Sequence, residues 1–232
     1  MPINASTCKL LSDKNLGKEN KAYLLKVGPV TIPVYCHMTG VGLGACGGGG
    51  WTLVMKIDGK KNTFRFDSKL WSNKKEFNLP GGKTGLDSQE TKLPTYWHTP
   101  FSKVCLAMKL DQQIKFTVIN VHANSLYSLI ADGKYRSTSL GRKAWKTLIG
   151  SQASLQLKCN KEGFNAVCDP GASRARIGFV ANNEKDCTSC DSRIGFGTTG
   201  GPHGNNTCGN VAKFQADNGE KSIKTMGGIF VQ

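Results

Sequence analysis

The sequence has no long apolar run. A membrane-spanning helix needs roughly 18 or more consecutive apolar residues, and no stretch of this chain reaches that length. The N-terminus also lacks the apolar region of a secretory signal, so we expect a mature form from which a signal was removed. Proline is scarce, at 8 residues against 28 glycines, which predicts many turns and close backbone approaches.

Several catalytic and nucleotide-binding motifs are missing as well. Four glycines at 47–50 lead into a strand pattern, but no GxxxxGK[ST] phosphate loop occurs and no helix pattern follows. We therefore interpret the glycines as a tight turn and reject nucleotide binding there. No GxSxG nucleophile motif occurs, and no Ser/His/Asp or Cys/His constellation can be argued. We expect that the protein is not an enzyme.

Acidic residues are few. The chain has 16 Asp and Glu against 31 Lys and Arg, which gives a net charge of +15. Such a surface attracts phosphate and other anions over a long range. The lysines are scattered, however, and no helix-turn-helix, zinc-finger or RNP pattern appears, so we expect no specific nucleic-acid partner. Acidic polysaccharides, anionic lipid and mineral surfaces remain as partners that this charge would favour.

The length and composition are those of a globular protein. A chain of 232 residues with 38% hydrophobic content can bury a sizeable core. We find no internal repeat and no linker, and we expect one domain over residues 1–232.

Cysteine is abundant, which points to an oxidising compartment. The only CxxC is Cys187–Cys190, which has neither the second close Cys/His pair of a zinc site nor the βαβ context of a redox motif, so disulfides are favoured. An odd count leaves one thiol free or paired to another chain, so a homo-oligomer is possible. Two glycosylation acceptors, Asn4-Ala5-Ser6 and Asn205-Asn206-Thr207, also favour a secreted, extracellular protein. The nine cysteines are Cys8, Cys36, Cys46, Cys105, Cys159, Cys168, Cys187, Cys190 and Cys208.

Hydrophobic patterns predict short elements throughout the chain. Strands are expected at 22–36 (a hairpin around Gly28-Pro29), 50–57, 63–66, 104–110 and 114–119 (a second hairpin, with its turn at 111–113), 153–159, 175–180 and 226–231. Short helices are expected at 125–131, capped by Ser125, and at 141–149, with a short helix or turn and a buried tryptophan at 67–73. Irregular structure is expected at 1–20, 76–92 and 182–223.

Two neighbouring motifs carry a family resemblance. Cys36-His37-Met38 precedes the glycine run, which continues into Trp51-Thr52-Leu53. This arrangement resembles the fibrinogen C-terminal-like domain, and its intelectin branch in particular; residues 51–59 are also similar to secreted coral skeletal-matrix proteins. The resemblance covers nearly the whole chain and is strongest at 31–57. It implies an α+β domain with a central antiparallel sheet, short helices and a long disulfide-braced irregular C-terminal region.

The resemblance also implies part of the disulfide framework. It implies an early bridge between Cys8 and Cys36, and a second between Cys159 and either Cys187 or Cys190, with Cys208 braced nearby. The cysteines left without an assigned partner are Cys46, Cys105 and Cys168.

Residues 182–191 hold many oxygen ligands close together. Ca²⁺ takes six to eight such oxygens, but no EF-hand pattern is present, so the spacing alone favours an ordinary polar surface loop. In intelectins this region binds Ca²⁺, and a vicinal diol of a microbial glycan completes the coordination. Carried over by position, the implied metal ligands are Asn183, Glu184, Asp191 and Asn210. The implied glycan-binding residues are Asn183, Glu184, Asp191 and His203.

Two functions follow as hypotheses. The first is a secreted carbohydrate-binding lectin, possibly calcium-dependent, that acts in recognition or defence. The second is an extracellular or skeletal matrix module whose basic surface binds acidic polymers or mineral.

Overall fold

The computed structural model describes residues 4–232 and contains two antiparallel sheets. The first sheet has the strand order β1-β2-β3-β13-β5-β6, and β4 also pairs with β3. Its strands are β1 (Lys21–Val27), β2 (Val30–His37), β3 (Trp51–Asp58), β4 (Thr91–Lys92), β5 (Phe101–Leu110), β6 (Gln113–Ala123) and β13 (Met226–Val231).

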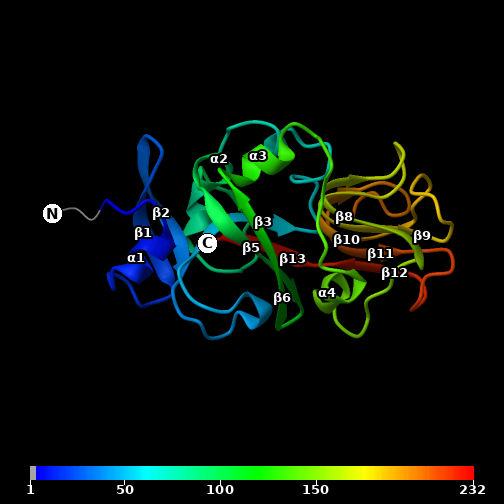
Figure 1. Ribbon diagram of the computed structural model, residues 1–232, viewed down its shortest axis with the longest axis horizontal. Coiled ribbons are helices and arrows are strands. Elements are labelled where there is room, and N and C mark those ends of the chain that lie inside the picture. The colour runs from blue at the N-terminus through cyan, green and yellow to red at the C-terminus, as the bar shows by residue number, and fades with distance from the viewer. Residues whose placement is uncertain (1–3) are drawn as a thin grey trace.

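The second sheet lies beside the first, at the right of Figure 1, and has the order β12-β11-β10-β9-β8-β7. The chain passes from one sheet to the other at Thr225, which separates β12 from β13. The strands of the second sheet are β7 (Arg136–Ser137), β8 (Lys158–Val167), β9 (Arg174–Asn182), β10 (Ser192–Thr199), β11 (Cys208–Ala212) and β12 (Lys221–Lys224).

The helices are all short. The α-helices are α1 (Cys8–Asp13), α2 (Thr95–His98), α3 (Leu126–Ile130) and α4 (Arg142–Thr147), and the 3-10 helices are η1 (Gly44–Cys46), η2 (Lys69–Trp71) and η3 (Leu79–Lys83). No helix among residues 4–232 combines the length and the apolar character that crossing a membrane requires.

Both sheets contribute to one main hydrophobic cluster. Sheet one supplies residues such as Met55 and Leu106, and sheet two supplies Phe164 and Phe179. Helix α4 adds Trp145, whose ring is fully buried. A second cluster lies under α1, β1 and β2 around Trp51. The burial of large aromatic side chains between the sheets supplies much of the apolar area that stabilises such a fold.

The glycine run before β3 forms the predicted tight turn. A Cβ at Gly49 would collide with the backbone carbonyl of Met38, so only glycine fits there. Trp51 then begins the strand, and its indole Nε1 donates to the carbonyl of Gly47 at 2.8 Å. Strand β3 is buried on both faces rather than on one, because the 79–92 segment covers the face that carries Lys56. The Lys56 ammonium is paired there with Asp87 at 2.6 Å.

Much of the expected local structure is confirmed. Both predicted hairpins form, as β1–β2 and β5–β6, and β13 lies between β3 and β5 in the first sheet. The Ser125 side chain caps α3 by accepting from the amide of Ser128, and α4 forms within the predicted 141–149 range. Trp71 is buried, as expected.

Other expectations are wrong. Residues 1–20, expected to be irregular, contain α1, whose N-cap Thr7 accepts from the amide of Leu10. Residues 63–66 form turns instead of a strand. The strand expected at 153–159 begins only at residue 158. The 76–92 loop contains η3 and β4, and it buries Glu90 and Lys92. The central sheet is two sheets, and the 182–223 region, expected to be irregular, contains β10, β11 and most of β12.

The cause of the last error is a row of glycines that crosses the second sheet. Gly163, Gly178, Gly195 and Gly209 pair with one another in register on β8, β9, β10 and β11. A Cβ at Gly195 would lie 2.9 Å from the Cα of Gly178, so the strands approach too closely for a side chain. These glycines therefore lie inside a sheet, although a glycine in a sequence is more often read as a turn.

Four disulfides cross-link the fold. Cys8–Cys36 is confirmed, and Cys46–Cys105 joins η1 to β5. The expectation that Cys208 is disulfide-bonded is wrong, because this residue on β11 is the free cysteine of the chain. Its thiol is fully buried between the sheets, and burial raises the pKa of the Cys208 thiol to about 12.

Candidate functional site

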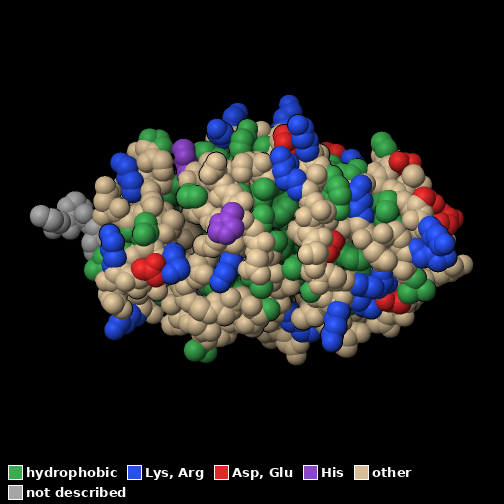
Figure 2. All heavy atoms as spheres, viewed as in Figure 1, with side chains coloured by type: hydrophobic (Ala, Val, Ile, Leu, Met, Phe, Trp, Pro, Cys, Tyr) green, Lys and Arg blue, Asp and Glu red, His purple; other side chains and the backbone are tan. Residues whose placement is uncertain are grey.

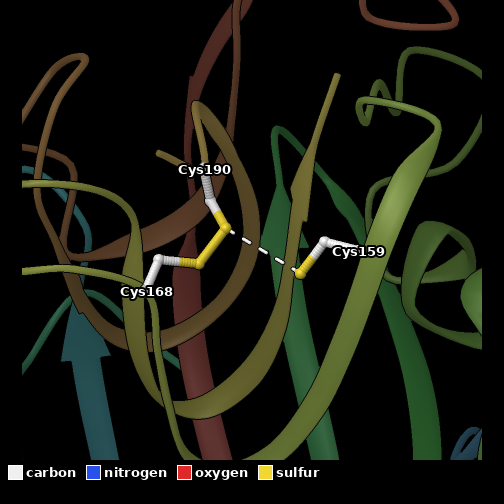
Figure 3. A group of neighbouring side chains, drawn as sticks. All are labelled: Cys159, Cys168 and Cys190. Atoms are coloured by element: carbon white, nitrogen blue, oxygen red, sulfur yellow. Dashed lines mark hydrogen bonds between the residues drawn. A yellow bond between two sulfur atoms is a disulfide. The ribbon is translucent and has the colours of Figure 1, made fainter. Parts of the chain in front are cut away.

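The 183–191 loop connects β9 to β10 and is clamped by two disulfides. Cys187 pairs with Cys159 on β8, while Cys190 pairs with Cys168 just after β8. The expected brace is therefore present, and of the two partners left open for Cys159 the structure selects Cys187. Figure 3 shows the Cys159 sulfur directed toward Cys190, with the two sulfurs 3.9 Å apart. The two bridges fix the loop to β8 and to the residue that follows it.

These sulfurs are not a metal site. Within residues 4–232, the only gathering of three or more potential His, Cys, Asp or Glu ligands is Cys159, Cys168 and Cys190. All three belong to disulfides, and the thiolate is the form of cysteine that binds metal.

Asn182 and Asp186 close the loop on itself. The Asn182 amide nitrogen donates to the carbonyl of Asp186 at 3.0 Å, and its oxygen accepts from the amide of Asn183 at 2.9 Å. The Asp186 carboxylate accepts from the hydroxyl and the backbone amide of Thr188. These bonds lower the pKa of Asp186, with the hydroxyl as the first cause. Asp186 is thus engaged within the loop.

Gln156 lies beneath the loop and holds two of the expected site residues. Its Nε2 donates to Asn183 Oδ1 at 3.3 Å and to the carbonyl of Phe214 at 3.0 Å. Its Oε1 accepts from the backbone amide of Asp191 at 2.9 Å. Gln156 is fully buried, so the amide must satisfy its bonds inside the protein. Sequence reasoning missed it, because a single glutamine carries no motif.

Asn183, Glu184 and Asp191 lie in one neighbourhood around this glutamine. Glu184 is exposed and accepts from the Ser189 hydroxyl at 3.2 Å. Burial raises the pKa of Asp191 above its ordinary value; the bond from Gln156 opposes this rise, and the negative charge of Glu184 adds to it. Two like charges that interact in this way would both be stabilised by a cation.

Asn210, the fourth expected metal ligand, is bonded to backbone groups. It is buried on β11, where its Oδ1 accepts from the Ser154 amide at 2.9 Å. Its Nδ2 donates to the carbonyls of Ser154 and Arg193, at 2.8 and 3.0 Å. Both ends of the amide are thus bonded to backbone groups, so Asn210 links β11 to β10 and to Ser154, and its role as a metal ligand stays a prediction.

His203 lies in the loop between β10 and β11, and its side chain is exposed. It follows a cis peptide bond between Gly201 and Pro202. No ligand group among residues 4–232 joins this imidazole to Glu184 and Asp191. The structure therefore brings together three of the expected site residues and not the other two.

A buried guanidinium shapes the loop that contains His203. Arg193 on β10 is fully buried, and no salt bridge in the described chain includes it. Its terminal nitrogens donate to the carbonyls of Gly200, Pro202 and His203, at 3.1, 3.2 and 2.8 Å. Burial lowers the pKa of Arg193 to about 9. The Arg193 side chain thus holds the β10–β11 loop in place, and no sequence motif predicts this role.

The sequence was compared with protein-family models and with curated proteins, and neither comparison finds a match. The fibrinogen-like resemblance therefore rests on the motif residues alone and stays a hypothesis.

Proposed function

We propose that the protein is a secreted carbohydrate-binding domain of the fibrinogen-like, intelectin-like type, and that its preferred ligands are acidic glycans. The observation that carries this proposal is the uncompensated positive charge of the surface. Figure 2 shows Lys and Arg side chains scattered over the visible face, where they outnumber the acidic side chains. A surface of one sign draws polyanions from a distance and raises their local concentration.

Burial changes the excess of positive charge at the surface very little. Glu90 and Glu162 are two of the 16 acidic residues, and both are buried. Glu162 accepts hydrogen bonds from the Trp145 indole and from the Gly141 amide, so its carboxylate is bonded inside the protein and does not offset positive charge at the surface. Lys56, Lys92 and Arg193 are buried as well, but they are a small part of the 31 basic residues. The exposed excess of positive charge therefore stays large.

The four disulfides support the extracellular part of the proposal, because such bonds persist in oxidising compartments. In an extracellular matrix, the same basic surface would attract acidic polymers or mineral by the same electrostatic interaction.

The test compares heparin, chondroitin sulfate and neutral dextran as immobilised ligands over a range of salt concentrations. We expect retention on the two sulfated polymers, no retention on dextran, and a steep loss of binding as salt rises, because screening weakens exposed charge interactions. Equal retention on dextran, or binding that salt does not change, would contradict the proposal.

A calcium-dependent lectin is the second candidate, and the interaction between Glu184 and Asp191 favours it. Ca²⁺ takes six to eight oxygens, so Asn183, Glu184 and Asp191 would need further oxygens from water or from a sugar diol. When bound, the ion would supply a Lewis-acid site for two adjacent hydroxyls.

The double variant Asn183→Ala, Glu184→Ala tests this second candidate on a glycan array with calcium and with chelator. Loss of chelator-sensitive binding, with salt-sensitive binding to heparin unchanged, would support a separate calcium site. Retained sugar binding in the double variant would remove the loop as the site.

A further inference from the structure

Beside α4 the surface has a wide, open cavity of about 670 Å³ whose charged lining is mostly cationic. The lining residues come from three distant segments: β6, the α4 region and the turn that contains Asp217. Its volume falls in the range of ligand sites, roughly 300 to 1,000 Å³. In Figure 2, Lys and Arg side chains gather where Figure 1 places α4. The residues that line the cavity are Lys115, Arg142, Lys143, Lys146, Thr147, Gly150 and Asp217.

Asp217 is the single carboxylate of this lining, and it neutralises only part of the positive charge. Its Oδ2 accepts from Arg142 at 3.0 Å and from Lys146 at 2.7 Å. Burial acts to raise the pKa of Asp217, but the hydrogen bonds from these two cations and from a backbone amide hold it below its ordinary value. Asp217 therefore stays charged and fixes two of the four cations in position.

The other two cations have no carboxylate partner in residues 4–232. The Lys115 ammonium donates to the carbonyl of Ile149 at 3.3 Å, and Lys143 is exposed. Gly150 makes room for the first of these, since a Cβ at that position would collide with the Lys115 ammonium. Lys115 and Lys143 are thus free to receive an anion.

A second cavity, of about 350 Å³, also includes Lys115 in its lining. Gln112, Gln113 and Gln152 also line it, and glutamine amides can bind sugar hydroxyls as donors and as acceptors. Its single carboxylate, Asp111, disfavours an anion on this side. Lys115 therefore stands between a cationic compartment and a neutral, amide-lined compartment.

We propose that these two cavities form one binding site for an acidic oligosaccharide. The sulfate or carboxylate group of a sugar binds among Lys115, Lys143 and the cations held by Asp217, and the hydroxyls of the adjoining ring contact the amide side chains. The inference deepens the proposed function, because it replaces a diffuse basic surface with a defined site. Single-stranded nucleic acid is the less suitable ligand, since no aromatic side chain lines either cavity to stack on a base.

The test uses the full chain and the double variant Lys115→Gln, Lys143→Gln. Its matched control is Lys18→Gln, Lys83→Gln, which removes the same charge from two exposed lysines outside both cavities. The probes are a sulfated heparin tetrasaccharide, the same tetrasaccharide without its sulfates, and a single-stranded oligonucleotide, titrated by calorimetry. Loss of two charge-assisted contacts should weaken sulfated-sugar binding about tenfold or more, while the control should change it less than about twofold.

The outcomes separate the inference from the proposed function. If the natural protein binds no acidic sugar, both are refuted. If it binds and the two double variants weaken equally, or neither weakens, the cavity site is refuted and the basic surface remains. If the desulfated sugar binds as tightly as the sulfated one, the carboxylate group is sufficient for binding. If the desulfated sugar does not bind, the sulfate group is necessary. Either outcome supports the site. Tighter binding of the oligonucleotide with the same loss in the cavity variant would assign the site to nucleic acid and overturn the inference. Because Lys143 is exposed, Lys143→Gln alone provides the same test if the double variant folds poorly.

Discussion

Replacing Asp217 with asparagine tests how the cationic cavity is held together. The Asp217 carboxylate accepts three hydrogen bonds: Arg142 and Lys146 donate to Oδ2, and the Leu155 amide donates to Oδ1 at 2.9 Å. Asparagine can keep the bond to Leu155, but it removes the charge and turns an NH₂ group toward two cations. Bonds to charged groups contribute about 1.5–3 kcal/mol each. The pairs keep 20–29% side-chain exposure, so solvent screening reduces the expected loss for Asp217→Asn to about 1–2 kcal/mol in total.

For a chain of this size such a loss should lower the melting temperature by about 2–8 °C. The assay is thermal unfolding at pH 7, with Asp132→Asn as the control. Asp132 also binds an arginine, Arg136, but that pair is more exposed, at 40% and 33%, so the control should shift less.

The pH dependence follows from the direction of the pKa shift. Because the folded pKa of Asp217 is lowered, its contribution is fully present above the unfolded pKa, near 3.9, and is lost as pH falls through the folded value. The difference between natural protein and variant should therefore shrink as the pH falls below about 4. An unchanged melting temperature at pH 7, or a difference that grows with acid, would refute the reasoning.

Three further predictions are simpler. Iodoacetamide should label no cysteine in the native protein and one in unreduced denaturant, because Cys208 is buried with a raised pKa; mass spectrometry counts the adducts. Gly49→Ala should destabilise the fold by about 1–3 kcal/mol through the clash with Met38, as measured by urea unfolding. The control is Gly42→Ala, where an added Cβ meets no other atom, so any loss of stability there should come only from the positive φ angle of residue 42. Gln156→Ala should cost about 1–3 kcal/mol, because it leaves the Asp191 amide and the Phe214 carbonyl unpaired, and any chelator-sensitive sugar binding should weaken with it.

The first sheet could be predicted well because its signals are local. Each hairpin has its turn within the sequence window that shows the alternation, as at Gly28-Pro29, and the terminal run 226–231 is apolar throughout. The second sheet could not be predicted in the same way. In β10, Gly195 lies opposite Gly178 because the strands approach too closely for side chains, and such glycines resemble turn residues in the sequence. Charged Arg193 in the same strand is buried because backbone carbonyls solvate its guanidinium, which no local pattern reveals.

The two candidate sites differ in the same respect. Asn183, Glu184 and Asp191 are neighbours along the chain, so a resemblance could point to them, but the structure shows that Asn183 depends on Gln156, 27 positions away. The cationic cavity combines Lys115, Arg142 and Asp217, and the last two are joined by a bond across 75 positions. Its lysines look like the rest of a scattered basic surface until the fold places them together around one carboxylate. A net charge of +15 can therefore predict that polyanions are attracted, whereas selectivity among them depends on which cations share a cavity and which are already paired.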